Sequence, residues 1–161
     1  MLLVQSQAYK QQYGFNAISL MPTNLYGIND NFDLETSHVL PALIRKWHEG
    51  KSYQHPITLW GDGTPMREFT YVDDLADALI FLMQNYDDPE IINVGAGKDV
   101  SIKELVAHLI DVVGYDGEIE WDLSKPEGMP KRLLDVSKLN SLGWKATTSL
   151  DEGLKFAYEY Y

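Results

Sequence analysis

Short apolar runs and longer amphipathic segments alternate along the chain. The short runs are bounded by Pro or Gly or by polar residues, and they cover residues 15–21, 57–60 and 91–94. Apolar runs of this length are typical of buried β-strands in an α/β sheet. Residues 119–121 alternate between apolar and polar side chains, which predicts a half-exposed strand.

The longer segments have apolar residues every three to four positions, which is the spacing of one face of a helix. They predict helices over residues 1–13, 37–49, 73–86, 101–113, 136–142 and 149–160. Ser37 is a suitable N-cap for the second helix, which Gly50 follows, and Asp73 and Asp74 are suitable caps for the third. A polar loop is expected over residues 23–36.

The order of these elements predicts the fold class. Strands separated by helices of about 10–15 residues are typical of βα units, which build a partly parallel sheet. Ser101 and Glu104 have the spacing of a capping box at the start of the fourth helix. We therefore expect an α/β protein, and the sequence contains no internal repeat.

Composition narrows the classes of function. The 161 residues include 24 acidic and 13 basic side chains, which gives a net charge of −11. This charge repels phosphate backbones and anionic lipid surfaces, so we expect no nucleic-acid partner and no membrane partner. The sequence contains no cysteine, and neither a membrane span nor a signal peptide is recognisable, so a cytoplasmic protein is expected.

Residue types alone leave the chemistry open. Gly95 and Gly97 follow a predicted strand, but the third glycine of a dinucleotide fingerprint would fall at Val100. A plain strand-to-helix turn is the favoured interpretation. The four histidines lack metal-binding spacing, so no metal is expected. Histidines and carboxylates remain as acid–base candidates, without an indication of which act.

Longer motifs carry a resemblance to a known family. They are MPTNLYG at 21–27, NDNF at 29–32, SHVLPAL at 37–43, LWGDGTPMREF at 59–69, SKPEG at 124–128, KRLLDV at 131–136 and LGW at 142–144. Together they resemble the GDP-L-fucose synthase family, within the extended short-chain dehydrogenase/reductase group. The resemblance implies the last strands of a Rossmann-like sheet with a small substrate-binding lobe.

The matching region is the C-terminal half of that family. The glycine-rich fingerprint, the catalytic serine, the epimerisation cysteine and the Tyr-x-x-x-Lys pair of the family precede it. None of the ten tyrosines here is followed by lysine four positions later. Residues 1–161 are therefore expected to be the C-terminal half of an NAD(P)-dependent epimerase/reductase, either truncated or one fragment of a split gene.

The resemblance also implies roles for individual residues. His38 matches an acid at the epimerised carbons, and an imidazole suits this role because it titrates near neutrality. The implied cofactor contacts are Pro22, Thr23, Asn24, Leu25 and His38. The implied substrate contacts are Asn24, Lys46, Trp60, Arg67 and Arg132. Lys46 stands where relatives often have arginine, and either Lys131 or Arg132 could reach the substrate.

The implied activity is conversion of GDP-4-keto-6-deoxy-mannose to GDP-L-fucose by 3,5-epimerisation and NADPH-dependent reduction of the 4-keto group. It implies NADP as cofactor, a GDP-sugar as substrate and a homo-oligomer, a dimer by resemblance. Two alternatives stay open. The chain could be a catalytically incomplete sugar-nucleotide-binding fragment, or part of another NAD(P)-dependent nucleotide-sugar epimerase or dehydratase. The pair Asp73 and Asp74 is assigned to helix capping, without a catalytic role.

Overall fold

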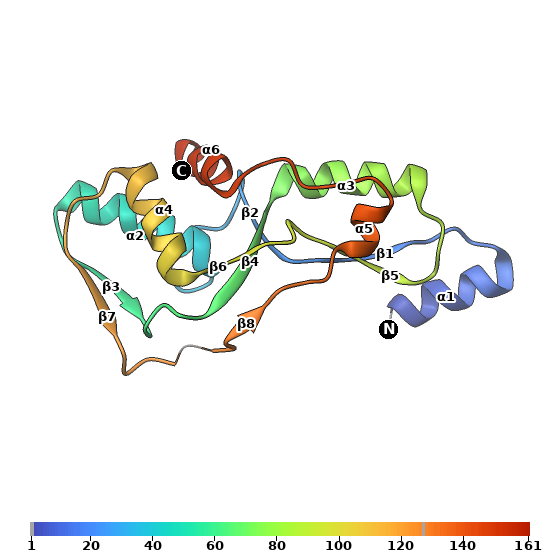
Figure 1. The fold of residues 1–161 in the computed structure, drawn as a ribbon, viewed down its shortest axis with the longest axis horizontal. Helices are drawn as coiled ribbons and strands as arrows, with labels where there is room; N and C mark the ends of the chain where they lie inside the picture. The colour runs from blue at the N-terminus through green and yellow to red at the C-terminus, as the bar shows by residue number, and fades with distance from the viewer. Residues whose placement is uncertain (1, 127) are drawn as a thin grey trace.

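The computed structural model describes residues 2–126 and 128–161. Six helices and eight strands alternate along this part of the chain (Figure 1). In chain order they are α1 Leu2–Tyr13, β1 Ser19–Pro22, β2 Asn24–Tyr26, α2 Val39–Tyr53, β3 Ile57–Trp60, β4 Met66–Tyr71, α3 Val72–Asn85, β5 Ile91–Val94, β6 Asp99–Ser101, α4 Ile102–Val113, β7 Ile119–Asp122, β8 Lys131–Arg132, α5 Ser137–Ser141 and α6 Leu150–Tyr160.

Figure 1 shows two lobes that meet near the C-terminal end of β4. The larger lobe contains α2, α4, α6 and the strands β2, β3, β4, β6, β7 and β8. The smaller lobe contains α1, α3, α5, β1 and β5. Each lobe has its own cluster of buried apolar side chains.

The larger lobe is built on β4. This strand pairs in parallel with β2 and β8 and antiparallel with β6, while β3 and β7 form a separate parallel pair. Helices α2, α4 and α6 pack on one another and bury their apolar faces. Trp47 of α2, Leu109 of α4 and Leu154 of α6 are all fully buried there.

The smaller lobe is built on the parallel pair of β1 and β5, in which Ser19 is in register with Ile91. Ala78 and Leu82 of α3 and Leu139 of α5 pack against Ile92 of β5. Because this sheet has two short strands, it buries far fewer side chains than the larger lobe. No side chain of α1 is buried among the described residues.

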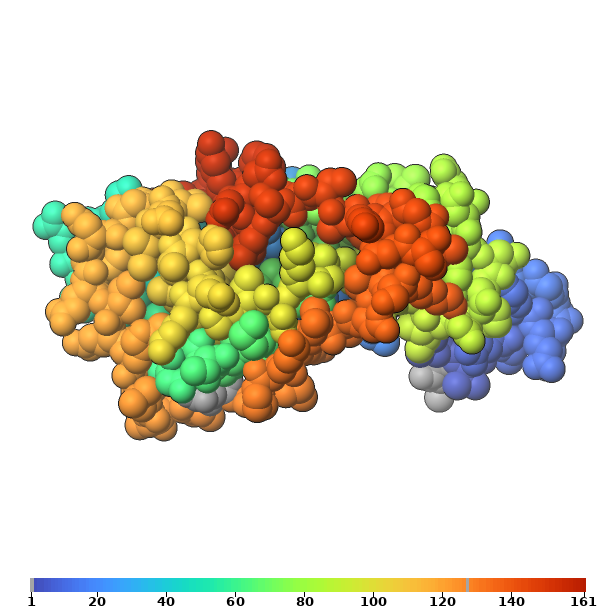
Figure 2. Space-filling model, viewed as in Figure 1, coloured from blue at the N-terminus to red at the C-terminus, as the bar shows by residue number. Residues whose placement is uncertain are grey.

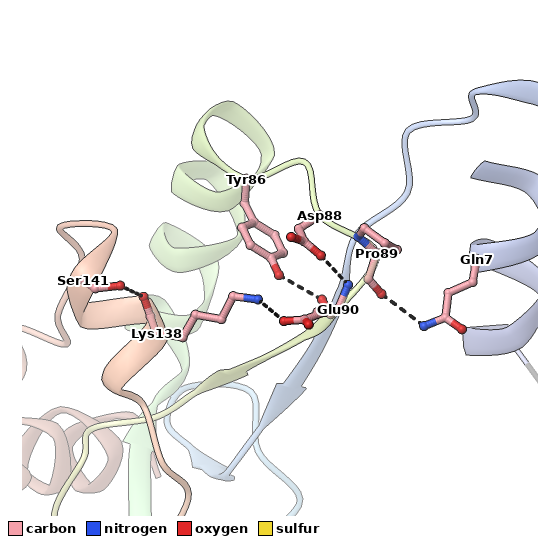
Figure 3. Close-up of polar contacts among 7 residues, drawn as sticks. All are labelled: Gln7, Tyr86, Asp88, Pro89, Glu90, Lys138 and Ser141. Carbon is pink, nitrogen blue, oxygen red and sulfur yellow. Dashed lines mark hydrogen bonds and ion pairs between the residues drawn. The ribbon is translucent and has the colours of Figure 1, made fainter. Parts of the chain in front are cut away.

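Polar contacts attach α1 and α5 to the rest of the smaller lobe; Figure 3 shows those of Gln7 and Lys138. The Gln7 amide of α1 donates to the Pro89 carbonyl at 3.2 Å, and Lys10 forms an ion pair with Asp87. On the other side, the Lys138 ammonium of α5 lies 2.8 Å from the Glu90 carboxylate, which raises the pKa of Lys138. These contacts are exposed, so each contributes little to stability.

The predicted α/β class with a partly parallel sheet is confirmed, since four of the five strand pairs are parallel. The capping box is also confirmed: Ser101 Oγ accepts from the Glu104 amide, and the Glu104 carboxylate accepts from the Ser101 amide. Ser149 and Glu152 form a second one at α6. None of the helices in the described part of the chain combines the length and apolar content needed to cross a bilayer.

Three predicted boundaries are wrong. The strand expected over residues 15–21 begins only at Ser19, because β5 offers four residues for pairing. The loop expected over 23–36 contains β2, which is too short to show a period in the sequence. The second helix continues through Gly50 to Tyr53, since a side chain at Gly50 would collide with Ile57.

The predicted caps at Ser37, Asp73 and Asp74 are also wrong. The N-cap of α2 is His38, and that of α3 is Tyr71, and neither forms a side-chain cap bond. Asp73 and Asp74 lie in the first turn of α3, where the helix dipole favours them. Asp74 is buried and accepts hydrogen bonds from the segment that leads into α6.

Candidate functional site

The end of β1 and the start of β2 form a turn at the edge of the larger lobe. Pro22 is the last residue of β1, and the Thr23 amide donates to the Val94 carbonyl at 3.1 Å. The side-chain amide of Asn24 donates to the backbone carbonyl of Glu68 at 2.8 Å. Leu25 follows in β2, half-buried against β4. These bonds fix four predicted cofactor-binding positions beside β4.

Two predicted substrate-binding arginines are neighbours on adjacent strands. Arg67 of β4 is in register with Arg132 of β8, and residues in register share one face of a sheet. Figure 2 shows the segment around β8 lying against the segment that leads into β4. Within residues 2–126 and 128–161, Arg67 donates only to the neighbouring Met66 carbonyl, at 2.8 Å. The described contacts thus leave most guanidinium donors of Arg67 available, as a diphosphate site would need.

Trp60 and Lys46 flank β3. Trp60 ends this strand and is 62% exposed, with the Lys125 ammonium 5.7 Å from the centroid of its ring. Lys46 of α2 is half-buried, and its ammonium donates to the Thr58 carbonyl at 3.2 Å. Burial lowers the pKa of Lys46, because leaving water disfavours the charged form. An anion bound nearby would restore part of the lost solvation.

His38 lies at the N-terminus of α2. Its carbonyl accepts from the Ala42 amide at 3.1 Å, while its exposed side chain forms no cap bond. The loop before it is held by its own turns, in which the Asp33 carboxylate accepts from the Thr36 hydroxyl and from the Glu35 and Thr36 amides. These hydrogen bonds lower the pKa of Asp33. The side chain of His38 is therefore free to meet a ligand. No described contact joins it to Arg67 or Asn24.

Sequence reasoning missed two residues of this region. Glu68 of β4 is fully buried, and Lys125 lies over the ring of Trp60. Glu68 lies directly beside Arg67 in the motif LWGDGTPMREF, and Lys125 lies within SKPEG. No sequence signal identified Glu68, because its burial is seen only in the structure.

A hollow of the described structure lies away from these residues. It has a volume of about 1020 Å³ and is lined by residues 95–98, 133–137 and 145–150, with Phe69, Val100 and Asn140. None of the predicted site residues lines it. The predicted residues lie instead on β2, β3, β4, β8 and α2, and at or just after the end of β1.

Comparison with known proteins decides the family. The model of the NAD dependent epimerase/dehydratase family matches residues 1–95. The chain belongs to this family. The match covers α1 to the end of β5, and thereby includes every predicted site residue except Arg132.

Relatives within the family are more specific. The chain is similar to "Probable GDP-L-fucose synthase 1" of Oryza sativa subsp. japonica, with 55% identity over 96% of this chain and 48% of the relative. It is 46% identical to GDP-L-fucose synthase of Escherichia coli, over 96% of this chain and 51% of that protein. The chain thus spans about half the length of the curated relatives it matches.

Solved structures agree with this family membership. The fold superimposes on a GDP-L-fucose synthetase from Naegleria fowleri with a TM-score of 0.92 and 28% identity, over 99% of this chain and 51% of that one. A GDP-6-OMe-4-keto-L-xylo-heptose reductase from Campylobacter jejuni gives a TM-score of 0.89 and 36% identity, over 98% of this chain and 57% of that one.

Proposed function

We propose that this chain is the substrate-binding, C-terminal half of a GDP-L-fucose synthase. In that assignment, residues 1–161 form one half of an enzyme that epimerises carbons 3 and 5 of GDP-4-keto-6-deoxy-mannose and reduces its 4-keto group. The names and identities of the relatives support it. The observation that carries it is the register of Arg67 with Arg132, and the exposed ring of Trp60 adds to it.

The chemistry of the substrate suits these groups. A GDP-sugar has a diphosphate that two planar guanidiniums bind through paired hydrogen bonds. Trp60 offers an exposed aromatic face to a base or sugar, and Lys46 and Lys125 add positive charge on either side of β3. In a chain with net charge −11, this local positive charge is what attracts an anionic ligand.

His38 is assigned to proton transfer. A base outside residues 1–161, the epimerisation cysteine by resemblance, would take the proton beside the ketone and leave an enediolate. The imidazolium of His38 would then donate a proton from a ring nitrogen to that carbon on the opposite face. The exposed side chain at the N-terminus of α2 supports this role, since no cap bond occupies it. Retention of the proton by His38 would leave the sugar unepimerised.

The cofactor would contact this half through few residues. Pro22 ends β1, and Thr23, Asn24 and Leu25 come directly after it; the carboxyl end of a strand is where open α/β sheets bind ligands. They fit the nicotinamide end of NADP, together with His38. NADPH supplies the hydride for the 4-keto carbon when bound. The glycine-rich element for its phosphates is not encoded between residues 1 and 161.

A binding-only function is the second candidate. It is favoured by one observation: no tyrosine of this sequence has a lysine four positions later. In that case the chain holds the GDP-sugar and catalyses nothing alone. An NADPH-oxidation assay on the 161 residues separates the two, because the binding-only function predicts no turnover. Measurable turnover would contradict it.

The direct test of the substrate assignment is calorimetry with GDP. The unchanged chain is expected to bind GDP, and Arg67→Ala is expected to weaken binding about tenfold or more, as loss of a charge-assisted pair does. Arg45→Ala is the matched control, since Arg45 contacts Glu49 and the Phe32 carbonyl instead. Equal affinities for all three proteins would remove Arg67 from the site.

We further propose a cytoplasmic homo-oligomer. Support comes from α1, which exposes Leu2, Val4 and Tyr13 without burying any described side chain. Sedimentation at increasing concentration tests it: a dimer is expected, and a monomer at every concentration would contradict it.

A further inference from the structure

Glu68 is a buried acid without a cation beside it. Its side chain is 0% exposed, and within residues 2–126 and 128–161 it forms no ion pair. Instead the carboxylate accepts from two backbone amides, Gly97 at 2.7 Å and Leu134 at 3.0 Å. Burying a carboxylate is costly unless such hydrogen bonds compensate it, which indicates a specific role.

The chain is shaped to admit this carboxylate. A Cβ atom on Gly95 would lie 2.3 Å from Oε1 of Glu68, so only glycine leaves room for it. Glu68 and Thr70 lie on the face of β4 opposite to Arg67, because side chains alternate along a strand. Glu68 therefore connects the turn after β5 and the segment after β8 from behind the arginines.

The backbone of Glu68 contacts the turn between β1 and β2. Its carbonyl accepts from the side-chain amide of Asn24 at 2.8 Å and from Thr23 Oγ at 3.3 Å. One residue thus joins four segments: the turn between β1 and β2, β4, the turn after β5 and the segment after β8.

The bond to Leu134 attaches the chain two residues beyond Arg132. The segment that contains β8 is attached to β4 at one end, where the Met66 amide donates to the Pro130 carbonyl at 2.7 Å. Two residues beyond Arg132, Glu68 accepts from Leu134. Arg132 lies between these two attachments. With the Glu68 bond absent, the distal end would keep the short β4–β8 pairing, the ion pair of Lys131 with Asp99 and the bond from the Asn93 side-chain amide to the Asp135 carbonyl at 2.9 Å.

We propose that Glu68 is a positioning residue: its carboxylate holds the segment after β8 so that Arg132 stays beside Arg67, and both arginines then bind one diphosphate. This proposal rests on the proposed function for its ligand, but the placement of Arg132 can be measured without any ligand. Glu68 touches neither substrate nor cofactor in this account.

The test compares Glu68→Gln with Thr70→Val. The glutamine keeps the shape of Glu68 but turns one acceptor oxygen into an NH2 donor, which then faces a backbone amide. Thr70 is the matched control, since it is 1% exposed on the same face of β4 and its hydroxyl has no hydrogen-bond partner among the residues that the structure describes.

Side-chain NMR of the arginines provides the first readout. The heteronuclear NOE of the Arg132 Nε–H group is expected to fall in Glu68→Gln and to stay unchanged in Thr70→Val, while Arg45 reports no change in either. An unchanged Arg132 signal in Glu68→Gln would overturn the proposal, whether or not the chain binds GDP. If Glu68→Gln does not fold, hydrogen exchange of backbone amides in the unmodified chain tests the proposal instead. The amides of Gly97 and Leu134 are expected to exchange slowly, and fast exchange of both would overturn the proposal.

GDP affinity provides the second readout. We expect Glu68→Gln to weaken GDP binding about tenfold, the size of one lost hydrogen bond to a charged group, and Thr70→Val to leave it unchanged. In an Arg132→Ala background, Glu68→Gln is expected to have no further effect, because coupled residues are not additive. An equal loss in both backgrounds would show that Glu68 acts on the whole fold rather than through Arg132. Absence of GDP binding to the unmodified chain would contradict the proposed function and leave the NMR test decisive for Glu68.

Discussion

The two lobes use the same helical pattern in different ways. In the larger lobe, α2, α4 and α6 turn their apolar faces inward, so that Trp47 and Leu109 are fully buried. In the smaller lobe, α3 buries Ala78 and Leu82 but leaves Ile80 and Met83 exposed. The apolar period of a helix predicts that a face will be covered, but it does not show which part of a molecule covers it.

The strands show the same contrast. In the larger lobe, β4 is paired on both sides. In the smaller lobe, β1 and β5 pair only with each other among the described residues, so the outer edge of each strand is open. Open edges and exposed apolar side chains favour association with other chains. The predicted binding residues belong mainly to the lobe whose core is complete.

The largest expected effect is in the core of the larger lobe. Trp47→Ala should lower the free energy of unfolding by about 3–5 kcal/mol, because it leaves a cavity where α2 meets α4. Ile80→Ala in α3 is the control and should change it by less than about 0.5 kcal/mol. Chemical denaturation measures both. Equal effects would contradict the contrast between the lobes.

A second effect concerns the connection between the lobes. The Asp74 carboxylate of α3 accepts from the Thr147 hydroxyl at 3.0 Å and from the Thr148 amide at 3.0 Å. Asp74→Ala should therefore cost about 1–3 kcal/mol, the range for buried donors left without partners. Asp73→Ala, at the exposed neighbouring position, is the control. Denaturation curves that coincide for the two variants would argue against this connection.

A smaller effect is expected at the helix N-termini. Ser101→Ala and Ser149→Ala should each cost about 1 kcal/mol, since each removes the side chain of a capping box in the larger lobe. Ser6→Ala in α1 is the control, because the Ser6 hydroxyl donates only to the Leu2 carbonyl of its own helix. Thermal unfolding measures the three variants, and a loss for Ser6→Ala as large as for Ser101→Ala would contradict this prediction.

The same caps predict a pH dependence. Hydrogen bonds from the Ser101 backbone and side chain lower the pKa of Glu104, and those from Ser149 lower that of Glu152. A carboxyl group whose pKa is lowered in the folded state stabilises the protein when the pH is above the ordinary pKa of 4.5. This stabilisation is lost as the pH falls through the folded-state pKa. Melting temperatures from pH 7 to pH 3 should thus fall less steeply for Ser101→Ala than for the unchanged chain. Parallel curves would refute this.

The smallest effect on stability is expected in α1. Val4 is 71% exposed, so Val4→Ser should change the free energy of unfolding by less than about 0.5 kcal/mol. Its effect should appear in sedimentation instead, as weaker self-association. A clear loss of stability would show that α1 packs more tightly than its exposed side chains indicate.

The sequence predicted the main helices and the α/β class well, because their apolar periods are long. It missed β4, the central strand of the larger lobe. It also missed β2, β6 and β8, which have two or three residues and pair only because β4 brings distant segments together. For the site, the motifs identified Arg67 and Arg132, but their shared register depends on a parallel pairing across 65 positions of sequence. The role of Glu68 could not be predicted, since its donors come from two distant turns.

Indole NMR during titration with GDP tests most directly the claim that the edge of the larger lobe binds a sugar nucleotide. The chain offers internal controls: Trp60 is exposed at the predicted site, whereas Trp144 is buried in the smaller lobe and donates to Asp77 at 2.7 Å. We expect the Trp60 Nε1–H signal to shift with added GDP and the Trp144 signal to stay in place. A Trp60 signal that does not move at saturating GDP would contradict the account.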